Sequence, residues 1–242
     1  MAGTALALAP RLTAAPAAAE FRSGWHTMPD RPWAGPEFWT NPLQDWRVAG
    51  GRLELVKAAP ARNVHVLTRE LAAGAGTLTM QVRLGRPGTE PIAGGKGGAG
   101  FNVGVVGPLK EYRNSLIFGT GLNCGLRSRG ELFIGNGPDA KSVPVALAAR
   151  NAVELRLELE TPAGGGATRL RLAAHDAADG TLLAAVERAD LPASIAGNLA
   201  LVANFGAAPA GAGPAAAKAA ANTDRWWFAD WRIAGSKVAV HA

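Results

Sequence analysis

The chain has 242 residues, of which 48% are hydrophobic, 6% aromatic and 18% charged, and its formal net charge is +6. This apolar fraction is enough for a packed core, and the length suits a single β-sandwich domain. The arginines are scattered through alternating segments, a pattern typical of the solvated face of strands, and no basic run is interleaved with aromatic residues. The composition therefore argues against a nucleic-acid-binding protein.

The first 19 residues have part of the pattern of an export signal. Residues 2–9 are apolar, and three alanines before Glu20 have the small-residue pattern of a cleavage site, but no positively charged region precedes the apolar stretch. The segment predicts an exported protein, periplasmic or extracellular, whose mature chain begins near Glu20. The alternative is the Ala-rich tail of a cytoplasmic protein. Because the apolar stretch is too short to cross a bilayer, we expect no membrane insertion.

Residues 20–42 form a lead-in that is rich in tryptophan and proline. Repeated proline disfavours regular structure, so we expect an irregular, extended segment. Its tryptophans are expected to hold it against the rest of the domain. Alternatively, some of them stay exposed as platforms for a ligand.

Residues 43–240 consist of short alternating segments that are separated by turns rich in glycine and proline. Apolar and polar residues alternate most strictly in residues 77–84 and 152–160, which predicts half-buried strands. We expect further strands at 46–48, 52–56, 63–71, 100–106, 112–119, 122–127, 131–134, 168–174, 181–188, 198–205 and from 225 onward. Residues 206–222 are predicted to be a low-complexity loop. About a dozen strands predict a single all-β domain, a sandwich of two antiparallel sheets.

Two segments near opposite ends of this domain are almost identical. Residues 45–50 read DWRVAG, and residues 230–235 read DWRIAG. Two similar strands can lie side by side in one sheet, each with its tryptophan inside and its arginine outside. We therefore expect Trp46 and Trp231 to belong to neighbouring strands that close the sandwich.

Several residues that often carry chemistry lack the partners that such chemistry needs. Cys124 is the only cysteine and lies in a strand-like run, so we interpret it as a small buried hydrophobic residue. Residues 94–98, GGKGG, lack the first glycine and the Ser or Thr of a phosphate-binding loop and predict a flexible hairpin loop. The four histidines are far apart, so we expect no metal site and no cofactor, and we interpret them as surface or turn residues: His26, His65, His175 and His241.

Acidic residues are also scattered. Glu154, Glu158 and Glu160 share one face of a predicted strand, but Arg156 interrupts them, as on a solvated sheet surface. Glycoside hydrolysis requires two carboxyl groups at a defined separation. The spacing of these three residues does not predict such a pair.

The remaining candidate site consists of polar side chains on or beside the central apolar strands. Amide and guanidinium groups suit hydrogen bonds to sugar hydroxyl groups, and a tyrosine can stack on a sugar ring. The alternative is that these side chains only form a solvated sheet face. The candidate ligand-binding residues are Asn102, Tyr112, Arg113, Asn114 and Asn204, with Asn123 and Arg127 beside them.

A family resemblance over about residues 40–240 rests on six segments and their order. These segments are DWRVAGGRLELV, RNVHVLTREL, GTLTMQVRLG, GAGFNVGV, EYRNSLIFGTGLNCGL and WWFADWRIAGSKV. The chain resembles the concanavalin A-like sandwich of secreted alkaline phosphatase D-type metallophosphatases. It is also similar to 3-keto-disaccharide hydrolase-type domains, in which a tryptophan strand, an L-x-T strand and a glycine-rich strand come in a similar order. The resemblance implies a concanavalin A-like jelly roll. It places no metal ligand and no catalytic residue of either family on a position of this chain.

The sequence thus predicts an exported, non-catalytic sandwich that binds a glycan or packs against a phosphoesterase domain or partner chain. The alternative is a glycoside hydrolase of the 3-keto-disaccharide hydrolase type. A binding module should have a polar and aromatic face without a close pair of acids. An enzyme should have two converging carboxylates, or a metal site, in a deep cleft.

Overall fold

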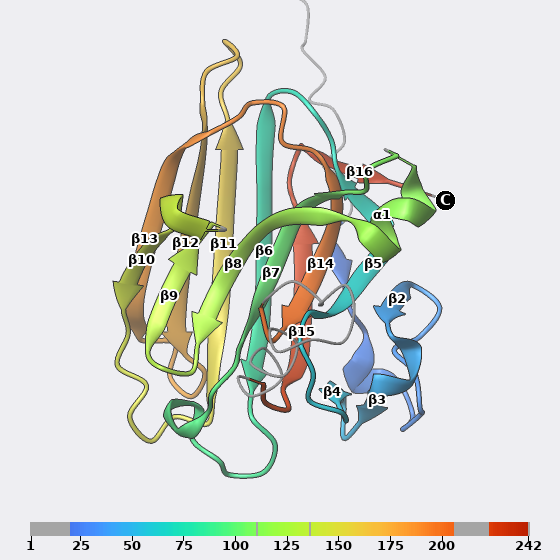
Figure 1. Cartoon of the computed structure of the whole chain (residues 1–242), viewed down its shortest axis with the longest axis vertical. Helices are drawn as coiled ribbons and strands as arrows, with labels where there is room; N and C mark the ends of the chain where they lie inside the picture. The colour runs from blue at the N-terminus through green and yellow to red at the C-terminus, as the bar shows by residue number, and fades with distance from the viewer. Residues whose placement is uncertain (1–19, 110, 136, 206–222, 242) are drawn as a thin grey trace, which may run out of the picture.

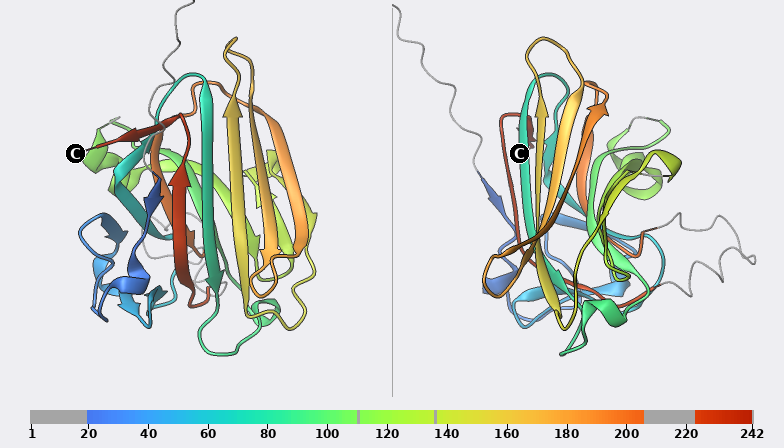
Figure 2. Two further views of the ribbon diagram at one scale, coloured as in Figure 1. Left: turned by 180° about the vertical axis from the view of Figure 1, so that it is seen from behind. Right: turned by 90° about the vertical axis from the view of Figure 1, so that its left-hand side faces the viewer.

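A computed structural model describes residues 20–109, 111–135, 137–205 and 223–241 of the chain (Figure 1). These residues form two antiparallel sheets of 8 strands each, which pack face to face as two layers (Figure 2). The predicted all-β sandwich is confirmed. The predicted export signal, residues 1–19, and the predicted low-complexity loop, residues 206–222, lie outside the described residues.

Sheet A is built from long strands that alternate strictly between apolar and polar residues. Leu78, Met80 and Val82 pair with Leu159, Leu157 and Leu155 on the neighbouring strand, and all six side chains are buried in the core. In spatial order the sheet contains β13 (Leu182–Leu191), β12 (Thr168–Asp176), β11 (Ala152–Thr161), β6 (Gly76–Gly85), β15 (Trp227–Ala234), β4 (Arg52–Leu55) and β3 (Trp46–Ala49), and β1 (Phe21–Arg22) pairs with β15.

Sheet B faces the viewer in Figure 1, and every residue of its strand β14 is buried. Phe101, Cys124 and Leu201 lie on its inner side and are fully buried. In spatial order the sheet contains β10 (Lys141–Pro144), β9 (Glu131–Ile134), β8 (Thr120–Arg127), β7 (Gly98–Val106), β14 (Gly197–Ala203), β5 (Arg62–Leu71) and β16 (Val238–Val240), and β2 (Phe38–Asn41) pairs with β5. Cys124 is unpaired and buried, as predicted, and this burial raises the pKa of its thiol.

The lead-in contributes a strand to each sheet, so it is less irregular than its prolines predict. Besides β1 and β2 it contains the 3-10 turn η1 (Trp25–Thr27); the other such turns are η2 (Leu43–Asp45), η3 (Ile92–Gly94) and η4 (Gly137–Asp139). Trp25 is fully buried and packs 5.0 Å from Phe38 and 6.5 Å from Trp231, measured between ring centroids. Trp33 is exposed, so the lead-in is held by only part of its aromatic residues.

The two nearly identical segments lie in the same sheet but are not neighbours. Trp46 and Trp231 are both buried, as expected, yet β4 lies between β3 and β15. The expectation of a directly paired couple is therefore wrong. The tight turn at Gly50 and Gly51, both with positive φ, folds β4 back onto β3. The other edge of β4 pairs with β15, so β4 separates β3 from β15.

Residues 112–119, predicted to be a strand, instead form the helix α1 (Tyr112–Phe118), so this prediction is wrong. The Glu111 carboxylate accepts hydrogen bonds from the backbone N–H groups of Arg113 and Asn114, at 3.1 and 3.0 Å, and thereby caps the first turn. Leu116 buries the helix against the sheet. No helix in the described part of the chain is long and apolar enough to cross a membrane.

The glycine-rich segment GGKGG is not a free hairpin loop, because it wraps around an internal carboxylate. Asp224 Oδ2 accepts hydrogen bonds from the N–H groups of Lys96 and Gly97, each at 2.6 Å. Asn204 holds the backbone of Asp224 from the other side: its Oδ1 accepts from Asp224 N at 2.9 Å, and its Nδ2 donates to Asp224 O at 2.9 Å. A Cβ at position 97 would collide with Asn204 Oδ1, which explains a glycine there. We call this arrangement the Asn204–Asp224 clamp.

Candidate functional site

A groove of about 630 Å³ lies on the outer face of sheet B. Asparagine side chains from four different segments are a prominent part of its lining: Asn41, Asn63, Asn102 and Asn123. We refer to it as the amide groove. It also contains the side chain of Val202 from the central strand β14.

The register of the strands explains why these asparagines meet. Asn63 pairs with Asn41 on one side and with Val202 on the other, while Asn102 pairs with Ala200 and with Asn123. Successive side chains of a strand point to opposite faces. Because the residues next to them along each strand are buried in the core, these asparagines all lie on the outer face.

Two of the asparagines carry an oxygen that is buried but has no hydrogen-bond partner among the described residues. These atoms are Asn63 Oδ1 and Asn102 Oδ1. Buried polar atoms in folded proteins are almost always hydrogen-bonded, because an unpaired one costs about 1–3 kcal/mol. Both residues line the amide groove, so these two oxygens are its candidate acceptors for a ligand with O–H or N–H groups.

Glycines allow close packing in and beside the groove. Gly100 and Gly125 pair across β7 and β8, and a Cβ on Gly100 would lie 2.6 Å from the Cα atom of Gly125. A Cβ on Gly121 would collide with Asn102 Oδ1. A larger residue at position 121 would displace the Asn102 side chain, and one at position 100 would push β7 and β8 apart.

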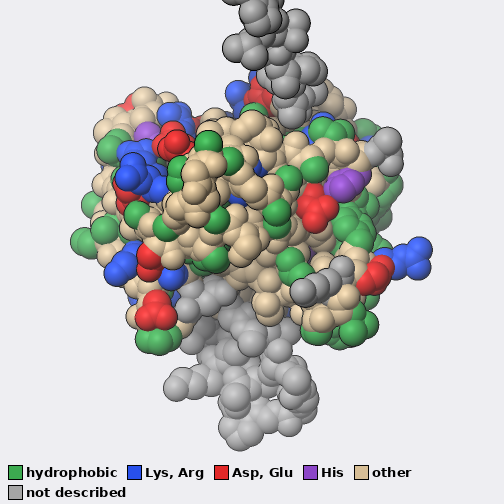
Figure 3. Space-filling view, turned by 90° about the horizontal axis from the view of Figure 1, so that it is seen from above, with side chains coloured by type: hydrophobic (Ala, Val, Ile, Leu, Met, Phe, Trp, Pro, Cys, Tyr) green, Lys and Arg blue, Asp and Glu red, His purple; other side chains and the backbone are tan. Residues whose placement is uncertain are grey.

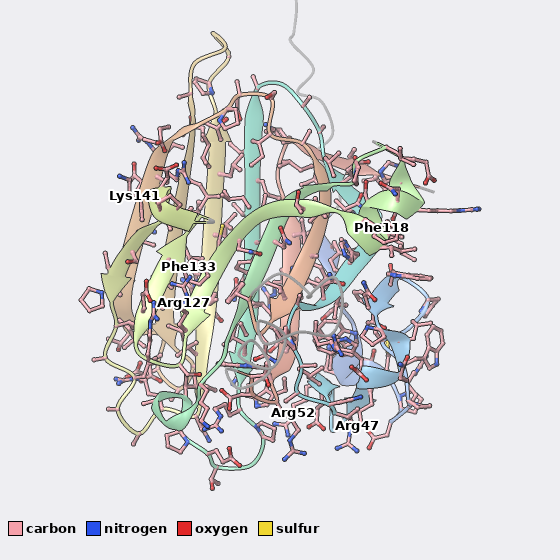
Figure 4. All side chains as sticks on the ribbon, in the orientation of Figure 1. Arg47, Arg52, Phe118, Arg127, Phe133 and Lys141 are labelled. Carbon is pink, nitrogen blue, oxygen red and sulfur yellow. The ribbon has the colours of Figure 1, made fainter. Side chains whose placement is uncertain are left out.

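Aromatic side chains lie at both ends of the groove. Phe118, at the end of α1, is 65% exposed, and Figure 4 shows it across the sheet face from Phe133. Phe205 packs edge-on against Phe133 with 4.8 Å between ring centroids. The Arg127 guanidinium covers the other side of the Phe133 ring at 3.8 Å. Of these rings, Phe118 and the half-buried Phe205 are accessible to a ligand.

The charge of the groove is balanced within the protein. Arg127 is the only charged residue among the described lining residues, and its Nη1 lies 2.8 Å from Glu131 Oε1. Burial opposes ionisation of Glu131, but hydrogen bonds from Arg129 and Arg127 hold the pKa of this carboxyl below its usual value. Outside the groove, Lys and Arg side chains lie next to acidic ones, as the left side of Figure 3 shows.

His65 lies beside the groove and is only 1% exposed, so its interpretation as a surface histidine is wrong. It occupies an outward position of β5, between Trp39 on β2 and Ala200 on β14. Neither ring nitrogen has a hydrogen-bond partner in the described structure. Burial lowers the pKa of His65 to about 4, so the ring is neutral at neutral pH.

The sequence-predicted ligand residues do not form one cluster. Asn102 lies in the amide groove, whereas Tyr112, Arg113 and Asn114 lie on α1. Tyr112 Oη donates to Leu67 O at 3.1 Å, and Asn114 Oδ1 accepts from Leu109 N at 3.2 Å. Asn204 belongs to the clamp. Asn123 and Arg127, which the sequence predicts to lie beside these candidates, both line the groove.

Sequence reasoning missed Asn63, whose Oδ1 is one of the two unpartnered acceptors. The signal was present, because Asn63 and His65 occupy alternate positions of a predicted strand and therefore share one face. What was not visible is that β2, from more than twenty residues earlier in the chain, pairs with this strand and adds Asn41 to the same face.

The acidic residues of β11 lie in sheet A, away from the groove. Glu154 pairs with Arg156 at 2.6 Å, and Glu158 lies 3.6 Å from Arg171. This supports their interpretation as part of a solvated sheet face. Within the described residues, no group of three or more His, Cys, Asp or Glu side chains is positioned to hold a metal ion.

The two 8-stranded antiparallel sheets have the fold of concanavalin A-like β-sandwiches, as the sequence resemblance implied. Among solved structures it is similar to the winged bean acidic lectin complexed with methyl-α-D-galactose (TM-score 0.55, 12% identity). It is also similar to arcelin-5, a lectin-like defense protein from Phaseolus vulgaris (0.53, 8%), and to the basic winged bean lectin with Tn-antigen (0.51, 13%). Each match covers 90% of this chain and 98% of the other. No protein-family model and no curated protein matches the sequence.

Proposed function

We propose that the chain is a carbohydrate-binding β-sandwich and that its ligand lies in the amide groove. The observation that carries this proposal is the pair of buried, unpartnered acceptors, Asn63 Oδ1 and Asn102 Oδ1, in a groove with accessible phenylalanines. Sugars present O–H donors at their edges and apolar C–H groups on their faces, so they match both features. The similar fold of two sugar-complexed lectins supports the same class of ligand.

The balanced charge of the groove favours a neutral glycan. Arg127, the only charged residue among the described lining residues, is already paired with Glu131. Binding is therefore expected to change little between about 0.05 and 0.5 M salt, a range that shortens the Debye length severalfold. Retardation in gels that contain neutral polysaccharides measures this directly. A strong loss of retardation at high salt would show that the net charge of +6 causes the binding instead.

Removing either unpartnered acceptor is expected to weaken binding. Asn63→Ala and Asn102→Ala should each raise the Kd about 5- to 13-fold, because a hydrogen bond contributes about 1–1.5 kcal/mol. The measurement is affinity electrophoresis of the purified chain, residues 20–242, with a panel of neutral polysaccharides.

Asn151→Ala is the matched control, because Asn151 is exposed and does not line the groove. Thermal melting of each variant shows whether it still folds. If the protein binds a polysaccharide and both folded groove variants bind it equally well, the ligand lies elsewhere.

The same gels separate binding from hydrolysis. Retardation without release of reducing sugar is expected for a binding module. Release of reducing sugar would replace the binding proposal with that of a glycoside hydrolase, such as the 3-keto-disaccharide hydrolase type that the sequence is similar to. The acidic residues would then be the next to substitute.

We further propose that the protein acts outside the cytoplasm, together with a phosphoesterase domain or partner. The pattern of residues 1–19 supports export, and the resemblance of about residues 40–240 to the sandwich of alkaline phosphatase D-type enzymes supports the partner. N-terminal sequencing of the protein from the extracytoplasmic fraction is expected to give a start near Glu20. Recovery of the full-size chain from the cytoplasm alone would contradict export. Co-purification of a phosphoesterase tests the second point.

A further inference from the structure

We infer that the amide groove binds several consecutive residues within a glycan chain, and not a single terminal sugar. This inference rests on the proposed function, because it specifies the ligand of the same site. It follows from the width of the groove, from the positions of its two unpartnered acceptors and from its aromatic ends.

The groove extends over many strands. Its lining includes residues of β2, β5, β14, β7, β8 and β9, which are consecutive neighbours in sheet B. At about 4.8 Å between neighbouring strands, these six strands extend over roughly 24 Å. The volume of about 630 Å³ also lies within the range of pockets that hold ligands larger than one ring, roughly 300–1,000 Å³.

The two acceptors are too far apart to lie under one part of a small ligand. Asn63 is on β5 and Asn102 is on β7, with β14 between them. In the register of β14 they are opposite Val202 and Ala200, so they are also offset by two residues along the strands. With about 4.8 Å per strand and 3.3 Å per residue, their backbones are roughly 12 Å apart.

Both side chains point outward from the sheet, so a ligand that satisfies both oxygens must extend over a similar distance. A single sugar ring is shorter than this distance. A ligand that contacts both acceptors must therefore contain more than one linked sugar residue. The remaining length of the groove holds further residues on either side.

The aromatic side chains fit the same arrangement. Phe118 lies across the sheet face from Phe133, against which Phe205 packs, and Phe118 and Phe205 each leave part of the ring accessible. Rings at the two ends of a groove can pack against sugar faces at both ends of a bound segment. A terminal-sugar site needs such a platform at one position only.

The test is a chain-length series of neutral oligosaccharides of glucose, mannose and xylose, from one to about six residues, with the affinity measured by calorimetry. The Kd is expected to fall with each added residue and to level off at about five. Reduction of the terminal sugar of the longest oligomer is expected to change its Kd less than threefold. An equal Kd for the monosaccharide and the longest oligomer would overturn the inference, as would loss of binding after reduction.

The groove variants give a second readout. Asn63→Ala and Asn102→Ala should both weaken binding of the longest oligomer, whereas at most one of them should weaken binding of the shortest oligomer that binds. If both variants weaken a monosaccharide, one sugar reaches both acceptors and the inference is wrong, although carbohydrate binding stands. If no neutral oligosaccharide or polysaccharide binds the folded protein, the proposed function itself fails.

Discussion

Replacing Asp224 by alanine is expected to lower the free energy of unfolding by about 2–3 kcal/mol, because it removes a charged acceptor that holds two backbone N–H groups. The Asp224 carboxylate accepts from Lys96 N and Gly97 N at 2.6 Å each and lies 3.4 Å from Arg86 Nη2. Its side chain is only 11% exposed. Alanine would leave the N–H group of the buried Gly97 without its acceptor, at a cost of about 1–3 kcal/mol, whereas Arg86 keeps Glu90 and Pro91 O as acceptors.

Urea denaturation measures this loss as a shift of the transition midpoint. Asp224→Asn should lose less, because the amide keeps one acceptor oxygen for the loop. Asp139→Ala is a control at an exposed acidic residue and should change the free energy by less than about 0.5 kcal/mol. If Asp224→Ala loses as little as this control, the clamp does not hold the glycine-rich loop.

Acidification is expected to destabilise the protein through His65. Burial lowers the pKa of His65 from 6.5 to about 4, so the native state favours the neutral ring. As the pH falls below 6.5, the unfolded state takes up a proton that the native state does not, and stability decreases until the pH passes the native pKa near 4. One pKa unit corresponds to about 1.4 kcal/mol, so the loss over this window is about 3 kcal/mol.

Comparison with His65→Gln isolates this effect, since carboxyl groups titrate in the same range. The free energy of unfolding, measured at several pH values, should fall less steeply in the variant, by about 3 kcal/mol in total between pH 6.5 and 4. Parallel curves for the two proteins would contradict a buried neutral His65.

The sequence predicts most of the strands because their alternation is strict. Leu78, Met80 and Val82 alternate with polar residues, and such a pattern fits only a half-buried strand. The helix α1 is not predicted from the sequence. The helix is stabilised by the burial of Leu116 against a sheet built from other parts of the chain, and the segment alone does not show this burial. The insertion of β4 between the two similar strands likewise depends on pairing across the whole chain.

The candidate site is predicted only in part, for a similar reason. Asn102 is found because it interrupts an apolar strand at an outward position. Asn63 and His65 are missed because β2 and β14, which flank their strand, come from distant parts of the chain. The role of Asn204 depends on its contact with Asp224. No local sequence pattern shows that these two residues lie side by side.

The most direct test of the amide groove is nuclear magnetic resonance of the asparagine side-chain NH₂ groups during titration with a neutral oligosaccharide that binds. We predict that the signals of Asn63 and Asn102 shift with the same saturation curve, while that of the exposed Asn151 stays in place. Shifts confined to asparagines outside the groove, such as Asn114 on α1, would contradict carbohydrate binding in this groove.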